Sequence, residues 1–371
     1  MATMILAQTA AEPELPLWAD VAAHVVVLAG AVRLLWVLGL RVAGRRPEVR
    51  PAPDLFPPWA GPADALRATA ALALAALAGY VLVTAVAAAF AGAAAKIAGA
   101  GGENARRFAL LGSDALGRLL GGCGSILVLT ALLCPGGRRA LGLTGAGLGR
   151  ALAVGADGFL WVYPVCLLLA AVVTQFVESR QHQILEFLSD AVGDGRWDLL
   201  ALLVFSAVVV APLAEELFFR GLIQSGLRSA FSRMRLFGGG PPEPPPAFPV
   251  AADVPPAFPV AAEVPPAFPV GAEVAPAFPV VAEVTPGPEV RPPPPPPVEP
   301  TRAARWAAIA VSSLMFAVVH DEVFAWPTLF VLSAAMGRVF DRTGSLAAPI
   351  ALHMLFNGWN IAMSLAQVSG R

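Results

Sequence analysis

The chain has 371 residues and a formal net charge of −1, with 57% hydrophobic and only 14% charged residues. Soluble domains carry about 25% charged residues, so this chain has too few to cover a water-exposed surface. The composition therefore predicts an integral membrane protein. The near-zero net charge, and a sequence without long runs of Lys and Arg, exclude nucleic acid as a partner.

The N-terminal segment, residues 1–20, is expected to be retained. Glu12, Glu14 and Asp20 stand where a secretory signal would carry its apolar stretch. The three cysteines lack CxxC spacing, so the sequence predicts neither a disulfide framework nor a thiolate metal site.

A helix that spans a membrane needs about 20 mostly apolar residues. The sequence predicts an all-α fold, a polytopic transmembrane helix bundle of about eight spans. We expect these spans at residues 21–40, 68–93, 119–134, 158–177, 199–222, 304–320, 324–340 and 347–366. The spans before residue 199 carry no recognisable motif, whereas residues 199–366 hold all the motifs described below.

The distribution of basic residues predicts the orientation. The first, third, fifth and seventh connections hold 17 of the 25 Lys and Arg residues, and the opposite side holds seven. Because cytoplasmic loops collect basic residues, both termini are predicted outside a multi-pass protein of the cell membrane. Arg33 lies within the first span, where it can pair or reach the interface.

Residues 238–301 form a proline-rich insert that holds 23 of the 36 prolines. A ten-residue unit recurs four times in it, beginning with AFPVAADVPP at Ala247. Proline at this density prevents helices and sheets, so we expect a disordered, polyproline-like cytoplasmic linker. It is either a docking site for proline-binding domains or an expanded, tolerated insertion, and the tandem near-identical copies favour the second interpretation.

Charged residues interrupt the fifth apolar segment after Pro212, which should kink the helix and free a backbone carbonyl. Glu216 and Arg220 are four residues apart, a favourable ion-pair spacing on a helix. Glu215 is rotated by about 100° from Glu216, which leaves it able to face a cavity. We interpret Glu216 as structural and Glu215 as reactive.

Two of the four histidines also lie in apolar segments of the C-terminal half. His320 ends the sixth segment, and His353 and Asn357 stand four apart on the eighth. A Glu/Arg pair alone is more often a packing clasp, and a His/Asn pair alone is more often an interhelical hydrogen bond. Together these residues supply a base, acid catalysts or metal ligands, and an oxyanion donor. His24 and His182 lack such company and are interpreted as structural.

These residues resemble the signature of the CAAX prenyl protease and bacteriocin-processing (CPBP or Abi) family of intramembrane metalloproteases. The three motifs are EExxxR at Glu215 to Arg220, FxxxH at Phe316 to His320, and HxxxN at His353 to Asn357. The resemblance covers about residues 199–366. The proline-rich insert departs from the family pattern but changes no motif residue.

The resemblance implies an intramembrane endopeptidase acting on a membrane-anchored peptide or protein near the cytoplasmic face. Glu215 would activate a water that His320 helps to hold, and His353 and Asn357 would stabilise the oxyanion. Zinc is a candidate cofactor, with Glu215, His320 and His353 as ligands, but the same groups can act without metal. The alternative is a non-catalytic bacteriocin-immunity or membrane scaffold protein that uses the same fold.

One geometric condition follows from the predicted spans. Simple helix lengths place His320 and His353 about 20 Å apart in depth. A shared site therefore requires that the sixth segment starts below the membrane surface or turns back within it.

Overall fold

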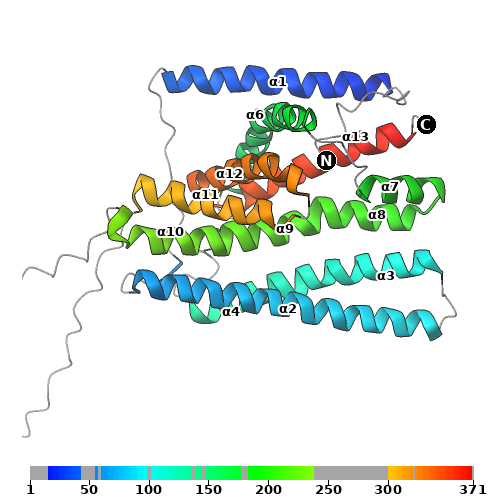
Figure 1. The fold of residues 1–371 in the computed structure, drawn as a ribbon, viewed down its shortest axis with the longest axis horizontal. Helices are drawn as coiled ribbons and strands as arrows, with labels where there is room; N and C mark the ends of the chain where they lie inside the picture. The colour runs from blue at the N-terminus through cyan, green and yellow to red at the C-terminus, as the bar shows by residue number, and fades with distance from the viewer. Residues whose placement is uncertain are drawn as a thin grey trace, which may run out of the picture. The chain divides into compact units, whose positions relative to one another are not determined.

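The computed structural model describes residues 16–42, 55–56, 60–97, 102–134, 139, 141–143, 147–176, 183–237, 300–320 and 322–369. Within these ranges every regular element is a helix, which confirms the predicted all-α class (Figure 1). Residues 238–299 of the proline-rich insert, His182 and most of the N-terminal segment lie outside the described residues.

Among the described residues, two long continuous helices contain π-helical segments: η2 lies within α3–η2–α4, and η3 and η4 lie within α8–η3–α9–η4–α10. The short elements η5 and η6 are 3-10 helices. In chain order the elements are α1 (Leu17–Val42), α2 (Pro62–Ile97), α3 (Glu103–Leu116), η2 (Gly117–Cys123), α4 (Gly124–Leu133), α6 (Leu148–Thr174), α7 (Gln183–Gly193), α8 (Trp197–Phe205), η3 (Ser206–Val210), α9 (Ala211–Glu216), η4 (Leu217–Gln224), α10 (Ser225–Ser232), η5 (Arg235–Phe237), α11 (Arg302–Val318), η6 (Val323–Ala325), α12 (Trp326–Thr343) and α13 (Ala347–Ser369).

Among the described residues, five helical stretches are long and apolar enough to cross a membrane. They correspond to the second, third, fourth, fifth and seventh predicted spans. The other three predicted spans fall on α1, α11 and α13, so the count of eight stays a prediction. The five stretches are Pro62–Lys96, Ala105–Leu133, Leu148–Thr174, Trp197–Ser232 and Val323–Thr343.

The third span is longer than the sequence pattern predicts. Asp114 and Arg118 interrupt the apolar run, but the structure continues the helix through them. Arg118 Nε donates a hydrogen bond of 2.8 Å to Asp114 Oδ2. Because each charge has a partner, both residues can remain inside an otherwise apolar helix.

The long α8–α10 helix lies between two groups of helices (Figure 1). On one side α2 packs against α3, η2 and α10, and on the other α11 packs against η4 and α12. A buried apolar cluster fills each side, with Leu72, Ile126 and Leu222 in the first and Phe316, Met336 and Leu352 in the second. The centre of this helix is therefore in contact with both halves of the chain.

Two glycines allow α2 and η2 to approach closely. A Cβ atom added to Gly121 would lie 2.2 Å from the backbone oxygen of Gly79, a separation that real side chains do not tolerate. Small residues at such crossings are typical of helix packing in membranes. This contact sets the position of the η2 segment, including Arg118.

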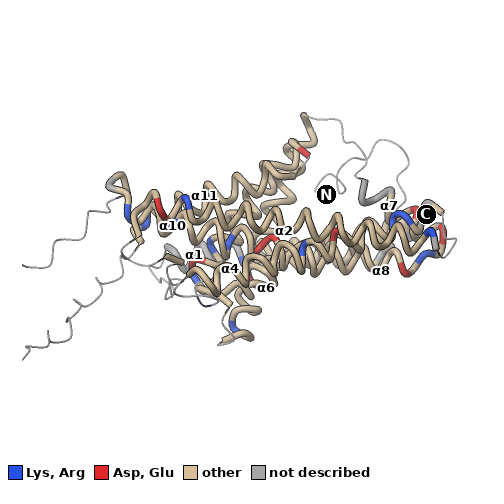
Figure 2. Tube along the Cα trace, turned by 90° about the horizontal axis from the view of Figure 1, so that it is seen from below, with Lys and Arg blue, Asp and Glu red and all other residues tan. Residues whose placement is uncertain are grey.

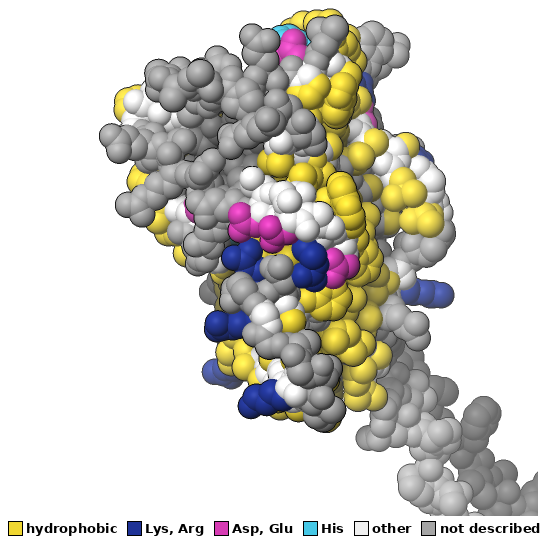
Figure 3. All heavy atoms as spheres, turned by 90° about the vertical axis from the view of Figure 1, so that its right-hand side faces the viewer, with side chains coloured by type: hydrophobic (Ala, Val, Ile, Leu, Met, Phe, Trp, Pro, Cys, Tyr) yellow, Lys and Arg dark blue, Asp and Glu magenta, His cyan; other side chains and the backbone are white. Residues whose placement is uncertain are grey.

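The surface fits a lipid environment. Large apolar side chains are exposed along α2, where Leu74 is 68% and Phe90 is 74% exposed. Charged side chains gather at the end of the molecule where α7 and the start of α8 lie (Figures 2 and 3). There Arg107 pairs with Asp190 at 3.1 Å. A gathering of charged side chains fits an end of the helices that is exposed to water.

Candidate active site

Glu215 and Glu216 end α9, close to the middle of the 36-residue helical stretch Trp197–Ser232. A helix of that length extends about 54 Å, and the hydrocarbon core of a bilayer is about 30 Å thick. The two carboxylates therefore lie at the depth of the apolar core. The π-helical segments η3 and η4 flank them, a departure from α-helix that is frequent at functional sites.

Glu216 and Arg220 form a buried ion pair, as their spacing predicts. Arg220 Nε lies 3.1 Å from Glu216 Oε2, and both side chains are 0% exposed. Arg220 Nη2 also donates to the hydroxyl of Ser333 on α12 at 3.0 Å. The guanidinium stacks 5.2 Å from the ring centre of Phe316 on α11. This pair ties three helices together, which agrees with the structural interpretation of Glu216.

His353 connects the two carboxylates. Its Nδ1 lies 3.0 Å from Glu216 Oε1, and its Nε2 lies 3.9 Å from Glu215 Oε2. A carboxylate paired with an arginine can only accept hydrogen bonds, so we assign the proton to Nδ1. The Nε2 atom then faces Glu215 across a gap too long for a direct hydrogen bond. Glu215 is 20% exposed, so its carboxylate is accessible from outside the cluster, whereas the His353 side chain is only 5% exposed.

His320 approaches the same cluster through an aromatic contact. Its ring lies 4.8 Å from that of Phe316, and the ring of Phe316 lies 5.8 Å from that of His353. The separation of about 20 Å that simple helix lengths give is therefore wrong. His320 stands just beyond the end of α11, where Trp326 Nε1 donates to its backbone oxygen at 2.9 Å. Its Nδ1 bonds the Phe316 carbonyl at 2.7 Å, which leaves Nε2 as the acceptor.

Asn357 is held by a carbonyl that Pro212 leaves without a backbone donor. In η3 the amide of Ala211 bonds the carbonyl of Ser206, five residues earlier. In this register the next carbonyl, that of Ala207, would need the amide of Pro212, and proline has none. Asn357 Nδ2 donates to Ala207 O at 2.9 Å instead. One of its two amide hydrogens is thus used to join α13 to η3.

Sequence reasoning missed a contribution from the first half of the chain. Arg118 Nη1 donates to Glu215 Oε1 at 3.2 Å, so the proposed reactive carboxylate has a cationic partner. Tyr80 on α2 donates to Asp114 Oδ1 at 2.6 Å, and Asp114 in turn accepts from Arg118. The signal was present in the sequence, because Asp114 and Arg118 are a charged pair four residues apart in an apolar stretch.

The described residues fit a zinc site only in part. Glu215 and His353 are close enough to be two ligands, but His320, the third predicted ligand, contacts Phe316 and Trp326. In the parts of the chain that the structure describes, no group of three or more His, Cys, Asp or Glu side chains is arranged to hold a metal ion. A catalytic zinc normally has three protein ligands.

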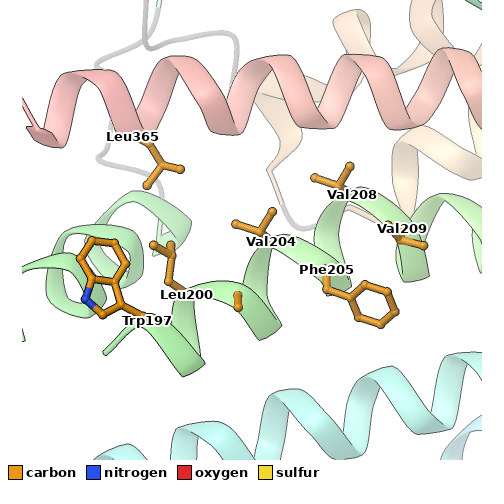
Figure 4. Close-up of a pocket in the computed structure, with 8 residues that line it drawn as sticks. Trp197, Leu200, Val204, Phe205, Val208, Val209 and Leu365 are labelled. Carbon is orange, nitrogen blue, oxygen red and sulfur yellow. The ribbon is translucent and has the colours of Figure 1, made fainter. Parts of the chain in front are cut away.

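An apolar pocket of about 540 Å³ lies beside the site, between α8, η3 and α13 (Figure 4). Its inner end is formed by Val208 and Val209, and Val208 directly follows Ala207, the partner of Asn357. Its outer end reaches Trp197 and Leu365. The pocket therefore runs along α8 and η3 as far as the neighbour of Ala207 in the chain, and it is lined by apolar side chains.

The fold and the site together define a helical membrane protein with a centre formed by the buried groups Glu216, Arg220 and His353 and the partly exposed carboxylate of Glu215. Residues 197–239 and 298–359 match the family described as type II CAAX prenyl endopeptidase Rce1-like. This match confirms the resemblance inferred from the three motifs, all of which lie within it. It stops and resumes on either side of the proline-rich insert. Comparisons with curated proteins and with solved structures find no match.

Proposed function

We propose that this protein is an intramembrane endopeptidase of the CAAX-protease type, which hydrolyses a peptide bond in a membrane-anchored peptide or protein. The observation that carries the proposal is the position of His353 between Glu215 and Glu216, inside the region similar to a protease family. Access from the cytoplasmic face remains a prediction from the distribution of basic residues.

In the proposed reaction Glu215 takes a proton from a water molecule, and the resulting hydroxide attacks the peptide carbonyl. The partial exposure of Glu215 and the distance of 3.9 Å between its Oε2 atom and His353 Nε2 support this role. The His353 ring lies between Glu216 and Glu215, and we propose that it acts in its protonated form, so that Nε2–H donates a hydrogen bond to the oxyanion while Nδ1–H stays on Glu216. The second amide hydrogen of Asn357 is the other proposed donor. When the tetrahedral intermediate collapses, the carbonyl re-forms, the C–N bond breaks, and the proton held by Glu215 passes to the leaving amine.

His320 is proposed to help hold the water through Nε2, since its other ring nitrogen is used by the Phe316 carbonyl. Zinc stays a candidate cofactor, but no step is assigned to it because Glu215 and His353 supply only two ligands. Metal analysis of the purified protein, with activity measured before and after chelation, tests it directly. A stoichiometric metal whose loss abolishes cleavage would require a third ligand at the site.

The pocket beside the site is proposed to hold the apolar part of the substrate near the scissile bond. Its walls are valine, leucine and aromatic side chains, and its inner end is next to the carbonyl that positions Asn357. Binding energy from an anchored, non-reacting part of a substrate can be used to orient the reacting bond.

The proposal is tested with a panel of membrane-tethered peptides presented to the purified protein in lipid nanodiscs. Wild type is expected to cleave at least one peptide, whereas Glu215→Gln and His353→Ala should lose about 10²-fold or more in rate. His24→Ala is the matched control, because His24 is exposed on α1 and bonds Asp20 there. Retention of the wild-type rate by both site variants would overturn the catalytic assignment.

The substrate can be found with the same variant. Glu215→Gln should retain peptides that wild type releases, and mass spectrometry of peptides trapped in native membranes identifies them. Binding of a partner without cleavage by wild type, unaffected by Glu215→Gln, would instead support the immunity or scaffold function.

A further inference from the structure

Arg118 joins the helices without motifs to the proposed base. Its Nη1 donates to Glu215 Oε1 at 3.2 Å, and its Nε donates to Asp114 Oδ2 at 2.8 Å. The other oxygen of Asp114 accepts from the hydroxyl of Tyr80 at 2.6 Å. A chain of hydrogen bonds thus runs from α2 through α3 and η2 to the end of α9.

The two oxygens of Glu215 have different surroundings. Oε1 is held by Arg118, whereas Oε2 faces Nε2 of His353 at 3.9 Å. A base must present one oxygen to the water in a defined direction, and a small misplacement is costly to the rate. The hydrogen bond from Arg118 fixes the rotation of the carboxylate so that Oε2 is the oxygen presented.

The guanidinium is itself held in place. Arginine presents its N–H groups in a rigid, planar fork, so it can bond two carboxylates in a fixed geometry. Asp114 takes one edge, and the Gly79–Gly121 contact brings the helix that carries Arg118 against α2. The side chains of Arg118 and Asp114 are 33% and 30% exposed, so, like that of Glu215, they are only partly buried.

We propose that Arg118 is a positioning residue for Glu215, and that Asp114 and Tyr80 act through it. The inference rests on the proposed function and extends it, because it assigns part of the active site to the N-terminal helices that lie outside the family match. The site is then incomplete in the C-terminal region alone.

Steady-state kinetics on a cleaved peptide test the role. Arg118→Ala should lower kcat about 10- to 100-fold, with KM within about threefold of wild type, because orientation rather than binding is lost. Arg118→Lys should have a kcat between those of Arg118→Ala and wild type, because lysine keeps the positive charge but lacks the planar set of N–H groups that bonds both carboxylates. Arg33→Ala is the matched control, since it breaks another Arg–Asp pair between two helices, that of Arg33 on α1 with Asp157 on α6, and neither residue contacts Glu215 in the described hydrogen bonds and ion pairs. A kcat for Arg118→Ala within about threefold of wild type overturns the inference.

The action of Asp114 through Arg118 is tested by combining variants. Asp114→Asn should lower kcat in the wild-type background and have little further effect in Arg118→Ala, because residues that act as a unit are not additive. Equal effects in both backgrounds overturn this part of the inference.

A measurement independent of activity separates the inference from the proposed function. The unfolding midpoint is measured for Arg118→Ala, Glu215→Gln and the double variant. If the two side chains interact, the shift of the double variant should differ from the sum of the two single shifts. Additive shifts overturn the positioning role even if wild type cleaves peptides. Non-additive shifts together with normal kinetics of Arg118→Ala overturn it as well. A wild-type protein that cleaves none of the tethered peptides overturns the proposed function, whatever the unfolding cycle shows.

Discussion

Arg220 is completely buried, and its charge is balanced within one turn of helix by Glu216. Ser333 and the ring of Phe316 complete its surroundings. A charge at this depth cannot be left unpaired, so the free energy of unfolding depends on the pair even though the pair itself adds little net stability. The same argument explains why Glu216 is poorly suited to be the base. If Glu216 took up a proton, the buried charge of Arg220 would lose its counter-charge.

We therefore predict that Glu216→Gln destabilises the protein by about 3 to 5 kcal/mol, because it leaves the Arg220 guanidinium buried without a counter-charge. Thermal unfolding in detergent measures this effect. Replacing both partners, as Glu216→Gln with Arg220→Met, should recover part of the loss. Asp198→Asn serves as the control, since its partner Arg196 lies at the charged end and the midpoint should stay unchanged. A midpoint of Glu216→Gln equal to wild type would contradict the prediction.

At the scale of elements, π-helical segments carry the departures from regular structure on which the site depends. In η3 the register and Pro212 together leave the Ala207 carbonyl for Asn357. In η2 the close contact of Gly121 with Gly79 on α2 holds the segment where Arg118 can donate a hydrogen bond to Glu215. Each irregularity thus connects two helices that are distant in sequence.

Gly121→Val should separate η2 from α2, because the added Cβ would lie 2.2 Å from the oxygen of Gly79 and the neighbouring atoms are backbone. We expect a lower unfolding midpoint and a lower kcat, since the shift moves Arg118. Gly112→Ala on the adjacent α3 meets nothing within 4 Å. That control should be neutral or stabilising by about 0.5 to 1 kcal/mol, from the lower flexibility of alanine in a helix. Equal midpoints for the two variants would refute the packing argument.

At the scale of the whole molecule, the residues on both sides of the proline-rich insert, 1–239 and 297–371, belong to one unit. The chain leaves and re-enters this unit at nearly the same point. Thr301 Oγ1 donates to the Phe237 carbonyl at 2.8 Å and also accepts from the amide of Ala304 to cap α11. A short linker can therefore replace the insert without moving either helix.

Replacing residues 240–296 with a short Gly/Ser linker should leave the unfolding midpoint and kcat within about twofold of wild type, since loop closure costs change slowly with length. Thr301→Val in the full chain tests the cap separately. It removes the hydrogen bond to the Ala304 amide and should lower the free energy of unfolding by about 1 kcal/mol. Loss of folded protein on deletion would show that the insert has a structural role.

Local patterns in the sequence determined the helical class, the apolar segments, the ion pair at Glu216 and Arg220, and the motif residues, because hydrophobicity and short spacings on a helix are properties of neighbouring residues. The tertiary structure alone decided that the ring of His353 contacts Phe316, that Asn357 bonds Ala207, and that Arg118 reaches Glu215. These contacts join residues 37 to 150 positions apart. They depend on helix packing and on π-helical register, which no single stretch of sequence encodes.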